Sequence, residues 1–123
     1  MSRYTYNMSN KMGGVKVVKI PKPRSAGEEL LAQQLRAYDI KFEREVKFHP
    51  SRKWRIDFVI GDLAAEVEGG IYNGGAHTRG SHFESDAIKY AEALLAGYRV
   101  VRFSTGQIKD GTAIDYIRKL IAK

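Results

Sequence analysis

Residues 55–68 read RIDFVIGDLAAEVE and are the most informative part of the chain about its fold. Two runs of alternating apolar residues flank Gly61-Asp62, and a two-residue turn with glycine first is typical of a type II′ β-hairpin. Because a two-residue turn fixes the strand register, Asp57 is expected to face Glu66 across the hairpin. The sequence therefore predicts a hairpin that holds two carboxylates opposite each other.

Alternation divides this hairpin into an apolar face and a charged face. The apolar face, expected in the core, holds Ile56, Phe58, Ile60, Leu63, Ala65 and Val67. The charged face holds Arg55, Asp57, Glu66 and Glu68, with Arg55 opposite Glu68. Like charges directly opposite each other destabilise a strand pair, whereas Mg²⁺ prefers oxygen ligands and often binds one or two carboxylates. We therefore expect a metal site at Asp57 and Glu66; the alternative is that these acids pair with Arg55 and other bases on a solvated face.

One helix is predicted before the hairpin and two after it. Ser25-Ala-Gly-Glu28 is a capping-box pattern, which predicts a helix over 26–38. The other expected elements are strands at 41–48, 54–60 and 63–68, a glycine-rich loop at 69–82, a helix at 83–96, a strand at 99–104 and a helix at 111–122. The apolar side of the helix over 83–96 is expected to consist of Ala87, Ala91, Leu94 and Leu95, with Gly97 as its stop. The order α-β-β-β-α-β-α predicts an α/β fold.

The net charge of +7 on 123 residues lies almost wholly at the N-terminus. Residues 1–26 hold six of the 21 Lys and Arg residues and no acid, so that 15 remain against 14 Asp and Glu. We therefore divide the chain into a basic arm, 1–24, and one folded domain, 25–123. Such an arm suits phosphate contact, with a solubilising leader as the alternative. Its candidate nucleic-acid-binding residues are Lys16, Lys19, Lys22 and Arg24.

Composition excludes several classes of protein. The chain has no cysteine, which rules out a disulfide framework and a thiolate metal site. It has neither the run of roughly 18 apolar residues that spans a membrane nor the apolar core of a signal peptide, so we expect no membrane partner and a cytoplasmic location. The basic balance favours a polyanionic partner, most simply nucleic acid.

Six blocks of sequence carry a resemblance to a known family. They are Ser25 to Glu28 with Leu31 and Leu35, RKWRIDF at 52–58, EVEGG at 66–70, HTRG at 77–80, DAIKY at 86–90 and YRVVRF at 98–103. Together they resemble the PD-(D/E)XK nuclease superfamily, most closely its small phage and very-short-patch-repair-like members. The resemblance covers about residues 25–104 and implies a restriction-endonuclease-like core, α-β-β-β-α-β with a C-terminal helix, in which helices flank a central mixed sheet. It also implies a phage or mobile-element gene in a bacterial host.

The resemblance implies roles for several residues. The family's metal-binding aspartate corresponds to Asp57, its second metal-binding acid to Glu66 and its first-helix glutamate to Glu28. The backbone carbonyl of Val67 is implied as a further metal ligand. Capping explains Glu28 equally well, and the two roles do not exclude each other. Glu29 is the alternative if the helix is rotated.

The sequence departs from the family at one position. The superfamily usually has a lysine two residues after the second acid, where this chain has Glu68. That lysine is thought to stabilise the attacking water and the charge that develops on the phosphate. Lys89 is the candidate replacement; the alternative is that it pairs with Asp86 and Glu92 along its own helix. Glu68 either binds a second metal or pairs with Arg55.

Two further features suit nucleic-acid contact. The predicted loop over 69–82 carries Tyr72, His77, Arg79 and His82 among its glycines. Such groups suit phosphate contact, and His77 is a candidate for proton transfer near neutral pH. The two histidines match no zinc-binding spacing. Trp54 either stacks on a base or packs in the core, and the strand alternation favours packing.

The resemblance implies a Mg²⁺-dependent endodeoxyribonuclease, with Mn²⁺ able to substitute, that hydrolyses DNA phosphodiester bonds. The catalytic candidates are Asp57, Glu66, Glu68, Lys89 and Glu28; the metal ligands are Asp57, Glu66 and Val67; Arg55, His77 and Arg79 join the arm as nucleic-acid-binding candidates. Because phosphate contacts do not read sequence, we expect structure-selective or weakly sequence-selective cutting. A Holliday-junction resolvase, a nicking enzyme and a non-catalytic nucleic-acid-binding module all stay open. A homodimer would place two sites on two strands.

Overall fold

The computed structural model describes residues 25–69 and 75–123, with the backbone alone over 75–82. In chain order the elements are α1 (Ala26–Ala37), β1 (Glu43–Lys47), β2 (Arg55–Ile60), β3 (Leu63–Glu68), α2 (Gly75–Leu95), β4 (Arg99–Ser104), α3 (Thr105–Lys109) and α4 (Thr112–Ile121). The predicted arm over 1–24 lies outside the described residues, and so do Lys16, Lys19, Lys22 and Arg24.

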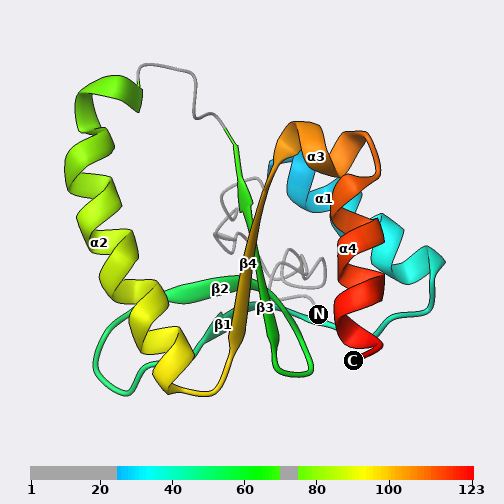
Figure 1. Cartoon of the computed structure of the whole chain (residues 1–123), viewed down its shortest axis with the longest axis horizontal. Helices are drawn as coiled ribbons and strands as arrows, with labels where there is room; N and C mark the ends of the chain where they lie inside the picture. Colours follow the sequence, from blue (N-terminus) through cyan, green and yellow to red (C-terminus); the bar gives the residue numbers. More distant parts are fainter. Residues whose placement is uncertain (1–24, 70–74) are drawn as a thin grey trace, which may run out of the picture.

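The four strands form one mixed sheet in the order β1-β2-β3-β4. The first three strands are antiparallel neighbours, whereas β4 runs parallel to β3 after the crossover through α2. Helices α1, α3 and α4 lie on one side of the sheet and α2 lies on the other (Figure 1). The predicted α/β fold, a central mixed sheet flanked by helices, is therefore confirmed.

The hairpin between β2 and β3 has the predicted register near its turn. Ile60 pairs with Leu63, and the next two pairs toward the site follow in step. Gly61 has a φ of 62°, while Asp62 is not among the described residues with positive φ. Positive φ at the first turn residue alone is the type II′ signature, which glycine adopts at no steric cost.

The predicted apolar face of the hairpin is wrong at Ile56. Phe58, Ile60, Leu63 and Ala65 join the larger core beneath α1, α3 and α4, whereas Ile56 packs with Val59 and Ala64 in a second cluster. The side-chain alternation of β2 therefore changes phase at Asp57. Glu45, the residue of β1 between the pairs that flank Asp57, has a φ of 52°. The register of the two strands is the same on both sides of this point, so both strands change phase together and strict alternation fails beside the predicted site.

Helix α1 forms as its sequence predicts. The Ser25 side chain accepts a hydrogen bond from the backbone N–H of Glu28 at 3.1 Å, which satisfies one of the unpaired donors of the first turn. Leu31 and Leu35 are fully buried against the sheet. Glu28 and Glu29 lie in the first turn, where the helix dipole stabilises negative charge.

Helix α2 departs from the prediction in length and orientation. It begins at Gly75, inside the predicted loop, because an isolated glycine such as Gly80 weakens a helix without ending it. Its predicted apolar side, Ala87, Ala91, Leu94 and Leu95, is exposed. Ala93 is buried instead. The helix presents to the sheet the face that also carries the half-buried Lys89 and Tyr90, both of which bind Glu66 of β3.

The short helix α3 was not predicted. It begins with a capping box in which Ser104 accepts from the N–H of Gln107 at 3.1 Å and the Gln107 side chain accepts from the N–H of Ser104 at 3.0 Å. The Ser-x-x-Gln pattern was therefore a readable start signal. Among the described residues, none of the helices is long and apolar enough to cross a membrane.

Candidate functional site

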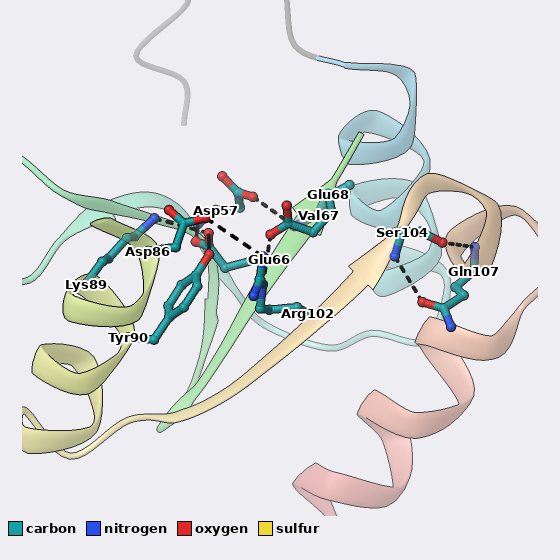
Figure 2. A network of polar contacts seen from close by, with 10 residues as sticks. All are labelled: Asp57, Glu66, Val67, Glu68, Asp86, Lys89, Tyr90, Arg102, Ser104 and Gln107. Atoms are coloured by element: carbon teal, nitrogen blue, oxygen red, sulfur yellow. Dashed lines mark hydrogen bonds and ion pairs between the residues drawn. The ribbon is translucent and has the colours of Figure 1, made fainter. Parts of the chain in front are cut away.

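Glu66 is the centre of the site. It is the only buried charged residue in the described part of the chain, with 6% of its surface exposed. Its Oε1 accepts hydrogen bonds from Tyr90 Oη at 2.9 Å and from Lys89 Nζ at 3.1 Å, and its Oε2 accepts one from the backbone N–H of Asp57 at 3.1 Å. Figure 2 shows these groups converging from α2 and the sheet. Burying a charge requires such partners, so this carboxylate is held in one position.

Asp57 lies beside Glu66 at the point where β2 and β3 stop pairing regularly. Its Oδ2 accepts a hydrogen bond from the backbone N–H of Val67 at 2.9 Å. The described pairing between β2 and β3 ends at Phe58 and Ala65. Beyond this pair, side-chain carboxylates accept the hydrogen bonds of the backbone N–H groups. Burial, followed by repulsion from Glu66, raises the pKa of Asp57 from 3.8 to about 7. The predicted juxtaposition of the two acids is therefore present, although not as a regular cross-strand pair.

Helix α2 brings two residues to the acids. The alternative for Lys89, pairing with Asp86 and Glu92 along its own helix, is wrong, because its ammonium lies 3.1 Å from Glu66 Oε1. The phenol of Tyr90 binds the same oxygen, and burial raises the pKa of Tyr90 above its usual range, so it remains a hydrogen-bond donor. Because the two residues are adjacent on one turn, a single helix orientation delivers both to Glu66.

Glu68 belongs to a second group of charges on the same side. Of the two alternatives for Glu68, pairing with Arg55 is wrong: Glu68 Oε2 accepts from Arg102 Nε at 2.9 Å, whereas the Arg55 guanidinium lies 3.5 Å from Glu45 Oε1. The cause is β4, whose parallel register places Arg102 beside Glu66 and within reach of Glu68. The Arg102 guanidinium also lies 4.8 Å from the centroid of the Tyr90 ring, so it links the two groups.

The glutamates of α1 approach the site from the other side. Arg44 of β1 lies 3.7 Å from Glu28 and donates to Glu29 at 3.2 Å. Glu28 is also close enough to contribute to the raised pKa of Asp57. Glu28 thus occupies the predicted capping position and lies near Asp57, whereas Glu29 pairs with Arg44.

The acids offer oxygen ligands for a hard cation. Asp57 Oδ1 has no hydrogen bond within the described residues, and Glu66 Oε2 has one, so both have lone pairs available. Because burial first and repulsion from Glu66 second raise the pKa of Asp57, a bound cation would stabilise its charged form. Over residues 25–69 and 83–123, no group of three or more His, Asp and Glu side chains is arranged to hold a metal ion. The two acids therefore suit a metal site with two carboxylate ligands, in which water and phosphate oxygens would fill the other positions.

The remaining predicted residues fall into two sets. The side chains of Tyr72, His77, Arg79 and His82 lie outside the described residues. Trp54 packs against Phe48, with ring centroids 6.1 Å apart and an interplanar angle of 16°, in keeping with the packing role rather than base stacking. Arg55 remains exposed at the start of β2.

Sequence reasoning assigned no role to Tyr90, Arg102 or Arg44. The first two lie in blocks that carry the family resemblance, DAIKY and YRVVRF, and that was their only signal. Their contacts depend on the rotation of α2 and the register of β4 on β3, neither of which local spacing reveals.

The comparisons with known proteins agree with this fold. No family model matches the chain, and no curated protein sequence does. Among solved structures, the chain is similar to the catalytic domain of the homing endonuclease I-Bth0305I, with a TM-score of 0.53 and 25% sequence identity. The similarity covers 81% of this chain and 93% of that domain. This neighbour is consistent with a nuclease fold.

Proposed function

We propose that this protein is a DNA endonuclease that uses a divalent metal, Mg²⁺ or Mn²⁺, bound at Asp57 and Glu66. We assign it to the PD-(D/E)XK superfamily, with cutting that is structure-selective or weakly sequence-selective. The observation that carries the proposal is the meeting of two carboxylates and one ammonium, from Asp57, Glu66 and Lys89, at one point of the sheet. The fold in which they meet resembles a homing endonuclease catalytic domain, which supports DNA as the substrate.

The residues of the site would have separate roles in binding the metal and the DNA. Asp57 and Glu66 hold the ion, and Tyr90 keeps the Glu66 carboxylate in place through its hydrogen bond at 2.9 Å. Lys89 supplies positive charge where negative charge develops on the phosphate, the role of the family's missing lysine. Arg55 and the basic arm would hold the DNA backbone without reading its sequence.

The metal, when bound, supplies Lewis-acid chemistry that activates a water molecule and polarises the scissile phosphate. Hydrolysis would break the bond from phosphorus to the 3′ oxygen, leaving a 5′-phosphate and a 3′-hydroxyl. Glu28 lies near enough to Asp57 to add negative charge, and Glu68 is held by Arg102. We also propose the Val67 carbonyl as a third protein ligand, because the N–H of Val67 donates to Asp57 and the backbone of this residue is therefore beside the site.

A panel of DNA substrates tests the proposal. Branched, nicked, linear and single-stranded DNA are incubated with the protein and Mg²⁺, Mn²⁺ or EDTA. We expect cutting of at least one substrate with metal and none with EDTA. A protein that cuts no substrate under any metal condition is not an endonuclease, and cutting that survives EDTA would overturn the metal site alone. Preference for a four-way junction would favour a resolvase, and single nicks in duplex DNA a nicking enzyme.

One observation favours a second function, a non-catalytic nucleic-acid-binding module on the same fold. Glu68 stands where the superfamily has lysine, and Lys89 and Tyr90 already bind the Glu66 carboxylate. In such a module the Lys89–Glu66 contact would only stabilise the fold. The module predicts salt-sensitive binding without cleavage, so the same panel separates the two functions.

A further inference from the structure

The connection between β1 and β2, together with the strand residue at each of its ends, concentrates positive charge in a domain whose net charge is only +1. Residues 47–55, here called the basic loop, read KFHPSRKWR and contain four cations and no acid. The side chains of Lys47, Arg52, Lys53 and Arg55 are exposed. A cluster of one sign attracts polyanions to its part of the surface.

The charge of this loop is largely uncompensated. Lys47 and Lys53 form no ion pair with any described residue. The Arg52 guanidinium lies 4.6 Å from the centroid of the Trp54 ring, a contact that leaves its N–H donors available at the edge of the plane. Arg55 is the exception, since its guanidinium lies 3.5 Å from Glu45. The loop can therefore offer donors to a ligand without breaking buried ion pairs.

His49 holds the basic loop in one shape. Its Nδ1 accepts hydrogen bonds from the backbone N–H groups of Arg52 at 3.0 Å and Ser51 at 3.2 Å. Its Nε2 lies 3.4 Å from Glu92 Oε1 on α2. Because the loop is ordered before binding, little conformational entropy is lost when a ligand arrives.

Helix α2 contacts both the basic loop and the Asp57–Glu66 site. Glu92, which contacts His49, and Lys89, which contacts Glu66, are three residues apart and therefore lie on one face of α2. Along β2, Arg55 precedes Asp57 by two residues, or about 7 Å at the usual rise of a strand. The basic loop therefore adjoins the two acids along both α2 and β2.

We propose that the basic loop is a phosphate-binding surface that grips the nucleic-acid backbone next to the Asp57–Glu66 site. The identification of that backbone as DNA rests on the proposed function. The loop works alongside the arm, and its distinct contribution is to align the backbone with the acids from a fixed position in the folded domain.

Binding measured without metal tests this surface. The variant Lys47→Gln/Arg52→Gln/Lys53→Gln is compared with Lys109→Gln/Lys119→Gln/Lys123→Gln, which removes the same charge from exposed positions at and after the helices on the other side of the sheet. Affinity for a short labelled DNA duplex is followed by fluorescence anisotropy in EDTA, from about 50 to 200 mM salt. Circular dichroism melting confirms that both variants are folded.

The loop variant should bind at least about tenfold more weakly at low salt, and the slope of log K against log salt should fall by about 0.9 for each phosphate that the loop no longer neutralises. The control variant should change neither quantity by as much. Equal effects in the two variants would overturn the proposal, because net charge alone would then explain binding. Because the binding assay contains no metal, its result does not depend on cleavage. Loop-dependent binding by a protein that cuts no DNA would support the basic loop and overturn the endonuclease. Loop-independent binding by a protein that cuts DNA would overturn the basic loop and support the endonuclease.

Discussion

Asp57 and Glu66 are fixed by hydrogen bonds to backbone groups on each other's strand. The Glu66 carboxylate accepts the N–H of Asp57 at 3.1 Å, and the Asp57 carboxylate accepts the N–H of Val67 at 2.9 Å. These bonds stand in for the strand ladder where β2 and β3 separate. Because an amide keeps one accepting oxygen, Asp57→Asn can keep the bond from Val67 while it removes the negative charge, whereas Glu66→Gln must also lose an acceptor on one side of the carboxylate.

The two acids should be essential for cutting. We expect Asp57→Asn and Glu66→Gln each to lower the rate of DNA cleavage by about 100-fold or more, because each removes a charged metal ligand. DNA binding in EDTA should persist, which an electrophoretic shift would check. Asp115→Asn, at an exposed position of α4, is the control and should cut normally. Near-normal cutting by either site variant would show that the metal site is misplaced.

Lys89 should be needed for the chemical step. Lys89→Met keeps the length of the side chain and removes the charge, so we expect at least about a 100-fold slower single-turnover cleavage rate with unchanged DNA affinity. The measurement is made well below the melting temperature, because removing one partner of a buried ion pair also destabilises the fold. Lys119→Met, which breaks the exposed pair with Asp115, is the control. An unchanged rate would assign Lys89 a purely structural role.

The phenol of Tyr90 should stabilise the folded protein through Glu66. Tyr90→Phe removes the donor at 2.9 Å but keeps the ring beneath Arg102. We expect a loss of about 1–3 kcal/mol in the free energy of unfolding, measured with urea, since the buried carboxylate loses a partner. Tyr116→Phe, at a ring that is 52% exposed, should change stability little. Equal effects of the two substitutions would contradict the role given to Tyr90.

Asp57 should make the metal-free protein less stable as pH rises. Its pKa is about 7 in the folded state against an ordinary value of 3.8, so between these values the native state binds more protons than the unfolded state. Stability from this group is therefore complete below about pH 4 and is lost as pH rises through about 7. We expect Asp57→Asn in EDTA to gain on the order of 2 kcal/mol over the wild type at about pH 8, and little at about pH 4.

An exposed aspartate, Asp62, serves as a control because its contribution to stability should change with pH in the opposite direction. The hydrogen bond from Arg99 holds the pKa of Asp62 below its usual value, so its contribution is present above that value and is lost as pH falls. Urea unfolding of the wild type, Asp57→Asn and Asp62→Asn across this pH range measures both effects. A stability difference for Asp57→Asn that does not vary with pH would contradict the raised pKa.

The basic arm should contribute affinity and leave the metal site unaffected. Deleting residues 1–24 removes six cations and no acid, so DNA binding should weaken and its salt dependence should flatten. Replacing Lys16, Lys19 and Lys22 by glutamine in the full chain separates charge from length. If the deletion leaves affinity and salt slope unchanged, the arm is only a solubilising segment.

Elements with local causes could be predicted from the amino-acid sequence. The capping residues before α1, the glycine of the hairpin turn and the alternation next to it act within a few residues, so the strand register near the turn followed directly. The closeness of Asp57 and Glu66 followed from that register. The same local patterns also contained the start of α3 at Ser104.

The partners that surround the two acids depend on contacts between segments that are far apart in the sequence. Apolar periodicity assigned the wrong face of α2 to the sheet, since the helix directs Lys89 and Tyr90 to the buried Glu66 carboxylate and leaves Leu94 and Leu95 exposed. Arg102 reaches the site through a parallel register set by a crossover rather than by a turn. Contacts between segments distant in sequence leave no local periodicity, and these contacts are what make an acidic pair into a candidate site.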